Sequence, residues 1–438
     1  MPSTGVTVPD PTASITTTNR GVQLGPPAPM DAPQGGDNPS FGTWLVTAES
    51  AFVRKQSQMA FLLGGGARSI PPGGSDVDCG QRQLVLRNAA AGLAPASGAS
   101  PLPELTPLET ASRAPASMLP STPGPIAAIP APAGAADLTP LGLEDFPRPV
   151  GDNGRGVHWI PTLHSTPETV DRFVQKAADM HMKWVVLLND GVSIGDNDYL
   201  VKRLVANGIM PVMRVFTNGL QPIGGDVESF VRHYTAMGVS YFQLYNEPNL
   251  MVETHGQPPD VGRYLDLWIP AAKRVVAAGG LPGIGALSPQ GEMDDRQFLS
   301  GMLDDLLARG EGGLLDRTWL AVHNYTGPRP MSDPDGFLRF RQYDAIARAK
   351  LGRSLPMVGT EGGTHVGPGV DERQQVDMVM DAYRYMSGHP DPYNFSYTYW
   401  IIANEAGGGR DSSFRQHALY REDGPTALAQ ALSHDGRY

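Results

Sequence analysis

Eight short apolar runs alternate with longer amphipathic stretches from Gly151 to the end of this 438-residue chain. This alternation constrains the fold most, because strands separated by helices form a parallel sheet. Eight such units in about 250 residues are typical of a (β/α)8 TIM barrel, an α/β fold. An open doubly wound sheet is the rival, but no G-x-G-x-x-G follows the first strand to favour it. We expect strands at 156–160, 183–188, 210–216, 240–245, 283–287, 319–325, 356–361 and 395–402.

The first helix of this pattern has a recognisable beginning. Ser165 and Glu168 have the spacing of a capping box, in which each side chain bonds the backbone N–H of the other end. Pro167 lies between them, and proline is favoured in the first turn of a helix. The barrel domain is therefore expected to occupy residues 151–438.

Residues 1–150 have a different composition. Thirteen prolines fall between Ala91 and Val150, and proline at this density blocks both helices and central strands. We expect 1–150 to be a largely disordered Pro/Ala/Gly-rich linker region that precedes the barrel. One helix is predicted within it near 43–63. Such a helix either docks weakly on the main domain or is an interaction or membrane-interface helix.

Charge and composition exclude several classes of function. The net charge is −11, which argues against nucleic acid or an anionic membrane as the main partner. The single cysteine, Cys79, excludes an intramolecular disulfide. No run approaches the ~20 apolar residues of a membrane span. The N-terminal sequence lacks the pattern of a secretory signal, so the cytoplasm is the default expectation; a mis-started N-terminus would leave an extracellular location open. The sequence indicates no oligomeric state.

Polar side chains gather where the predicted strands end. In a (β/α)8 barrel the functional residues lie at the C-terminal ends of the strands, whereas the strand bodies fill the core. The fourth strand ends at an amide and a carboxylate followed by Pro248, which cannot donate a ladder hydrogen bond. The site residues that we single out are Arg214, Asn246, Glu247, His323, Tyr325, Glu361 and Trp400. Further residues near strand ends are His158, Trp159, Asn189, Asn218, His255 and Gln290.

Strand alternation predicts which side chains share a face. Met357, Gly359 and Glu361 are expected on one face of the seventh strand. In the eighth strand, the smaller set is expected to point into the barrel and the bulkier set toward the helices. The inward set is Ser396, Thr398 and Trp400, and the outward set is Phe395, Tyr397 and Tyr399.

Two carboxylic side chains that face one cavity suggest acid–base chemistry, best if their environments separate their pKa values. To cleave a glycosidic bond, one carboxyl must be protonated to give a proton to the leaving oxygen, and the other must be ionised. Strands four and seven lie on opposite sides of an eight-stranded barrel, so Glu247 and Glu361 are expected to face each other across its mouth. A carboxyl separation of ~5–5.5 Å would imply retention of configuration.

The segments "LYNEPN" (244–249) and "MVGTEGG" (357–363) resemble the retaining glycoside hydrolases of the (β/α)8 superfamily called clan A. That clan carries Asn-Glu at the end of strand four and a nucleophilic Glu at the end of strand seven. The H-x-Y pattern of His323 and Tyr325 and the tryptophan Trp400 are also similar. The resemblance covers residues 151–438, and it implies that Glu247 is the general acid/base and Glu361 the nucleophile.

The resemblance also implies supporting roles. Asn246 would hydrogen-bond the sugar 2-hydroxyl, Tyr325 and His323 would hold Glu361, and Trp400 would stack on the sugar. The clan usually places its arginine on strand two, whereas Arg214 lies on the predicted third strand, so its role of lowering the Glu361 pKa rests on proximity alone. Purely structural roles are the alternatives for three of these residues: His323 as a core histidine, Arg214 in a structural ion pair and Trp400 as a core tryptophan.

The predicted function is hydrolysis of O-glycosidic bonds, β-linked by expectation, in an oligosaccharide or polysaccharide substrate. The alternatives are a non-catalytic glycan-binding barrel and a transglycosidase that uses the same residues. No cofactor is expected. No metal site is expected either, because the histidines are scattered and no H-E-x-x-H spacing occurs. The sugar, its linkage and endo or exo action cannot be read from these motifs.

Overall fold

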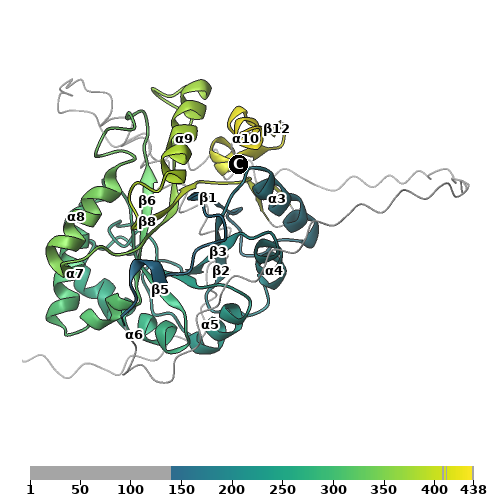
Figure 1. Cartoon of the computed structure of the whole chain (residues 1–438). Helices are drawn as coiled ribbons and strands as arrows, with labels where there is room; N and C mark the ends of the chain where they lie inside the picture. The colour runs from purple at the N-terminus through teal and green to yellow at the C-terminus, as the bar shows by residue number, and fades with distance from the viewer. Residues whose placement is uncertain (1–139, 407–408, 411, 437–438) are drawn as a thin grey trace, which may run out of the picture. The chain divides into compact units, whose positions relative to one another are not determined.

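The computed structural model describes residues 140–406, 409–410 and 412–436. Its centre is a closed barrel of eight parallel strands, each paired with the next in chain order, with β1 and β8 closing the ring (Figure 1). The predicted (β/α)8 fold is confirmed, and the third and sixth strands have the predicted bounds. The strands are β1 (Arg155–His158), β2 (Trp184–Asp190), β3 (Met210–Phe216), β4 (Tyr241–Leu244), β5 (Leu281–Leu287), β6 (Trp319–Tyr325), β7 (Met357–Gly363) and β8 (Asn394–Tyr399).

A helix follows each strand along the chain, and the helices surround the barrel (Figure 1). None of the helices in the described ranges is long and apolar enough to cross a membrane. The predicted helix near 43–63 and the rest of the predicted linker up to residue 139 lie outside the described residues. The helices are α3 (Pro167–Asp179), α4 (Asp198–Ala206), α5 (Val227–Ala236), α6 (Val261–Ala277), α7 (Asp295–Ala308), α8 (Arg339–Leu351), α9 (Glu372–Ser387) and α10 (Ala427–Ser433).

The start of α3 differs by one residue from the predicted capping box. Thr166, rather than Ser165, is the N-cap, and its hydroxyl accepts a hydrogen bond from the backbone N–H of Thr169 at 3.3 Å. Pro167 occupies the first turn as predicted, where its missing N–H costs no intrahelical bond. The expected pairing of Ser165 with Glu168 is therefore wrong, although the helix begins within one residue of the predicted start.

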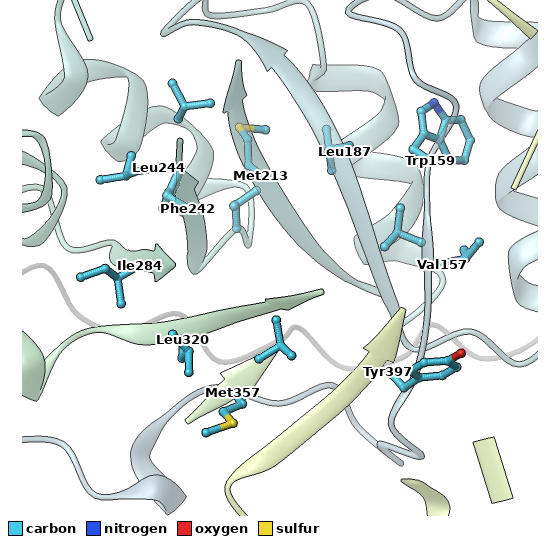
Figure 2. Packing of buried hydrophobic residues seen from close by; sticks show 14 of the residues in the cluster. Val157, Trp159, Leu187, Met213, Phe242, Leu244, Ile284, Leu320, Met357 and Tyr397 are labelled. Carbon is cyan, nitrogen blue, oxygen red and sulfur yellow. The ribbon is translucent and has the colours of Figure 1, made fainter. Parts of the chain in front are cut away.

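The larger hydrophobic core lies between the strands and the helices. Figure 2 shows side chains of this cluster, many of which come from the strands. Burial of each large apolar side chain contributes about 1.5–3 kcal/mol, so this layer is what fixes the helices against the barrel. Labelled members are Val157, Trp159, Leu187, Met213, Phe242, Leu244, Ile284, Leu320, Met357 and Tyr397.

A second, aromatic core fills the barrel interior near the beginnings of the strands. The ring of Tyr241 lies 5.5 Å from that of Trp184 and 5.6 Å from that of Trp319, centroid to centroid. Phe146, from the segment before β1, packs in the same cluster. The packed part of the chain thus begins before residue 151, and this end of the barrel is filled with side chains.

Three residues interrupt the regular pairing of the strands, all between β5 and β8. Ala286 in β5, Thr360 in β7 and Phe395 in β8 are each skipped in the register with a neighbouring strand. An extra residue of this kind bends the strand and changes the direction of the side chains that follow it. Strict alternation therefore fails in this half of the barrel.

The skipped residues correct two predictions about side-chain direction. Met357 and Glu361 do not share a face: Met357 packs between the barrel and the helices, whereas Glu361 contacts Arg214 of β3 across the interior. Phe395 does not face the helices, because it belongs to the interior aromatic cluster with its ring 6.5 Å from that of Trp184. Tyr397 and Tyr399 do face the helices, as predicted.

Candidate functional site

Glu247 follows the end of β4 in an unusual backbone conformation. Tyr245 and Glu247 both have positive φ angles, 65° and 38°, a left-handed region that non-glycine residues rarely adopt. The backbone N–H of Glu247 donates to the carbonyl of Ala286, 3.0 Å away, which is the skipped residue of β5. Strained residues of this kind cluster at functional sites, and here the irregularity in β5 supports the turn that carries the carboxylate.

Asn249 ties this turn to the next loop. Its side-chain Nδ2 donates to the carbonyls of Ser288 at 2.8 Å and Met293 at 3.0 Å. Its Oδ1 accepts from the backbone N–H of Ser288 at 2.9 Å. Because Asn249 is buried and all three contacts are to backbone, the position of the Glu247 turn is fixed against the loop after β5.

Glu361, near the end of β7, has hydrogen-bond donors on both carboxylate oxygens. Arg214 Nη1 donates to Oε1 at 2.8 Å, and the Tyr325 hydroxyl donates to Oε2 at 2.9 Å. The three side chains are almost completely buried, where a charge needs such partners. Burial, and next the charge of Glu361, raise the pKa of Tyr325 well above its ordinary value of 10, so the phenol stays a donor. Arg214 lies on the third strand, as counted from the sequence.

His323 of β6 lies between the two carboxylates. Its Nδ1 is 3.1 Å from Glu247 Oε1 and 3.8 Å from Glu361 Oε2. Each of these three residues has one atom able to bind a metal ion, and the three atoms lie within 4.8 Å of one another. Two carboxylates and an imidazole are ligands that a divalent ion can use, which the sequence spacing did not predict. Both Glu361 oxygens already accept hydrogen bonds, and the Arg214 guanidinium supplies the positive charge that a metal ion would otherwise provide there.

Trp400 follows β8 directly and lies beside a buried histidine. Its ring centroid is 4.2 Å from that of His158 and 5.9 Å from that of Phe414. Burial lowers the pKa of His158 to about 3, so this imidazole is neutral at ordinary pH. His158 Nδ1 is 2.9 Å from the Trp159 carbonyl and must carry the proton there. Within the described part of the chain, His158 Nε2 and Trp400 Nε1 are buried without a hydrogen-bond partner, as expected of groups that meet a ligand or water.

Asn246 contacts a third carboxylate, which the sequence did not predict as part of the site. Its Nδ2 donates to Glu253 Oε1 at 3.1 Å. Glu253 lies in the loop after β4 and is 8% exposed. No motif marks this position, and only its place six residues after Glu247 in a loop over the barrel mouth could have suggested it.

The remaining candidates are dispersed. Of the six further residues near strand ends, His158 lies at the site beside Trp400. Asn189 instead braces the loop after β2, donating to the carbonyls of Gly191 and Ser193, each at 3.1 Å. Trp159 is buried among the helices, so it serves the fold rather than the mouth.

Glu253 should make the stability of the protein depend on pH. Burial raises its pKa from 4.5 to about 7. The folded protein therefore keeps a proton that the unfolded chain releases, and this stabilising contribution, complete below pH 4.5, is lost as the pH rises through 7. As the pH rises across that window, we expect the free energy of unfolding of Glu253→Gln to increase relative to that of the wild type, by up to about 3 kcal/mol.

Urea unfolding between about pH 4.5 and 8 measures this difference. Glu372→Gln, at an exposed position at the start of α9, is the matched control and should show no such trend. A stability difference between Glu253→Gln and wild type that stays constant with pH would contradict the prediction.

Comparisons with known proteins find similarity of structure only. No family model matches the chain, and no curated protein matches it. Among solved structures, a family 39 glycoside hydrolase from the gut symbiont Bacteroides cellulosilyticus WH2 is 14% identical with a TM-score of 0.46, over 64% of this chain and 64% of that one. A GH128 endo-β-1,3-glucanase from Pseudomonas viridiflava is 17% identical with a TM-score of 0.41, over 65% and 98%.

The β-glucuronidase 2 of Bacteroides uniformis is 13% identical with a TM-score of 0.43, over 65% of this chain and 36% of that one. This chain thus spans 64% of the length of the family 39 enzyme and 36% of that of the β-glucuronidase.

Proposed function

We propose that this protein is a retaining glycoside hydrolase that cleaves β-linked O-glycosides, with Glu361 as nucleophile and Glu247 as general acid/base. The observation that carries the proposal is the pairing of these carboxylates at the barrel mouth, with an oxygen of each within 4.8 Å of the other. This separation supports a retaining mechanism, since inverting enzymes keep their carboxyl groups ~6.5–9.5 Å apart to admit water.

In the first step, a Glu361 oxygen attacks the anomeric carbon while Glu247 gives its proton to the leaving oxygen. The bond to the leaving group breaks and a covalent glycosyl-enzyme forms. Arg214 and Tyr325 hold the attacking carboxylate in place and stabilise its negative charge before the attack. When His323 Nδ1–H donates to Glu247 Oε1, the other oxygen of Glu247 is the one that carries the acid proton.

In the second step, the Glu247 carboxylate takes a proton from water as the water attacks the anomeric carbon. The bond to Glu361 breaks, and two inversions give net retention. Trp400 offers an apolar surface to the sugar ring, and its unpartnered indole N–H is a donor for a sugar hydroxyl. A sugar in place of water in this step would give transglycosylation by the same residues.

A panel of 4-nitrophenyl β-glycosides of neutral hexoses and pentoses, assayed with EDTA present, tests the proposal. We expect release of 4-nitrophenol from at least one of them. Proton NMR of the same reaction should show the β-anomer of the free sugar first, with the α-anomer appearing only by mutarotation. The α-anomer appearing first would exclude the double displacement. If the protein hydrolyses none of the glycosides but binds oligosaccharides measurably, the result would favour a glycan-binding barrel.

A further inference from the structure

Glu253 is held in place by the backbone on both sides. Its N–H donates to the carbonyl of Leu250 at 3.2 Å, and its carbonyl accepts from the N–H of Leu220 at 2.7 Å. The second contact joins the loop after β4 to the loop after β3. The loops approach closely at Gly219, where a Cβ atom would lie 2.6 Å from the Glu253 carbonyl oxygen. The carboxyl group is therefore presented by a fixed backbone.

The carboxyl group of Glu253 selects one orientation of the Asn246 amide. When Glu253 is ionised, above its pKa, its oxygens can only accept, so Oε1 takes the NH2 group of Asn246, 3.1 Å away. The Asn246 carbonyl must then lie on the opposite side of the amide. That Oδ1 atom is buried and has no hydrogen-bond partner among the described residues, which leaves an acceptor next to Glu247 for a ligand or water to satisfy.

Packing alone gives no reason for an acid at this position. A buried carboxyl group is costly unless it is well paired, and Arg214, the nearby cation, bonds Glu361. The charged groups that act on Glu253 are Arg214 from β3, Glu247 from the end of β4 and Glu361 from β7. Two of these three repel a negative charge at Glu253. An apolar residue would be less costly to bury in this surrounding.

We propose that Glu253 is a positioning residue, which fixes the Asn246 amide with its carbonyl toward the bound sugar. Asn246 then accepts a hydrogen bond from a hydroxyl or amine of the sugar beside the anomeric carbon. This inference rests on the proposed function. It adds the requirement that the sugar carry a hydrogen-bond donor on the carbon beside the anomeric carbon. Without Glu253 the amide is free to turn, and the NH2 group competes for the same position.

A double-mutant cycle tests whether Glu253 acts through Asn246. The probe is the 4-nitrophenyl β-glycoside that the wild type cleaves with the highest kcat/KM. At a pH above 7, where Glu253 is ionised, Glu253→Leu should lower kcat/KM by about 10- to 100-fold, the effect of losing a hydrogen bond to a charged group. Glu253→Gln keeps an acceptor oxygen for Asn246 and should recover most of that loss. In an Asn246→Ala background, adding Glu253→Leu should cost no more than about twofold.

Equal losses from Glu253→Leu in the two backgrounds would overturn the proposal, as would a Glu253→Gln variant as impaired as Glu253→Leu. Circular dichroism and thermal unfolding establish that each variant is folded.

A second measurement needs no turnover. In protein labelled with 15N-asparagine, the side-chain resonance that Asn246→Ala removes should shift with pH around the Glu253 pKa of about 7. The shift should be absent in Glu253→Gln, and a resonance insensitive to pH in the wild type would also overturn the proposal. If the wild type cleaves no glycoside but the resonance titrates, the proposed function fails while the positioning contact stands.

Discussion

Glu361→Ala should lower kcat for the best aryl β-glycoside by at least about 10,000-fold, since removal of a nucleophile leaves only binding and electrostatic effects. Arg214 and Tyr325 would lose their shared partner, and the space left by the carboxylate would admit a small anion. Added azide should therefore restore part of the turnover. The azide attacks from the side that Glu361 occupied, so the product should be the inverted α-glycosyl azide, which NMR identifies.

Asp196→Ala is the matched control for this experiment. Asp196 is an exposed carboxylate in the loop after β2, on the same end of the barrel. Its removal should leave kcat within about twofold of wild type, as surface substitutions usually do. Substantial turnover by folded Glu361→Ala without azide would remove Glu361 from the mechanism.

Glu247→Ala should have an effect that depends on the leaving group. A general acid contributes typically 10²- to 10⁴-fold, and its help is needed most when the leaving oxygen is basic. We expect kcat/KM to fall by about 10²- to 10⁴-fold for a 4-methoxyphenyl glycoside. For a 2,4-dinitrophenyl glycoside, whose leaving group departs without a proton, the loss should stay below about tenfold.

Azide distinguishes this variant from the nucleophile variant. In Glu247→Ala the glycosyl-enzyme still forms on Glu361, so azide attacks the opposite face and the product should be the β-glycosyl azide. Equal losses for the two leaving groups would show that Glu247 does not act as the acid. An α-azide product would assign the nucleophile to Glu247 instead.

The sequence was sufficient for the barrel and for the approximate positions of its strands, because these follow from apolar periodicity and from residues that stop a strand. The run before Asn246 and Glu247 is one example, since Pro248 indicates that the strand stops nearby, although β4 ends at Leu244 and the two residues lie in the turn that follows. The contact of Glu361 with Tyr325 was also foreseeable, because the two residues end neighbouring strands.

Other parts of the site depend on tertiary contacts that no local pattern encodes. Glu253 is placed by bonds to Leu250 and Leu220, the latter on a different loop. Thr360 and Phe395 are skipped in the strand register, so strict alternation wrongly placed Met357 on the same face as Glu361 and Phe395 toward the helices. Pairings between distant segments cannot be derived from the period of a single strand.

The skipped residue in β7 has a consequence for alignment and for protein engineering. Val322 pairs with Gly359, but His323 pairs with Glu361, so the strand is one residue longer than its neighbour requires. Any residue-by-residue alignment with a regular barrel has to open a one-residue gap at Thr360. Without that gap, Glu361 is matched to the position opposite Asn324, one residue further along, where a side chain points to the other face of the strand. Deleting Thr360 would make Gly359 and Glu361 consecutive partners of Val322 and His323, so the strand would become regular and the carboxylate would keep its place facing Arg214.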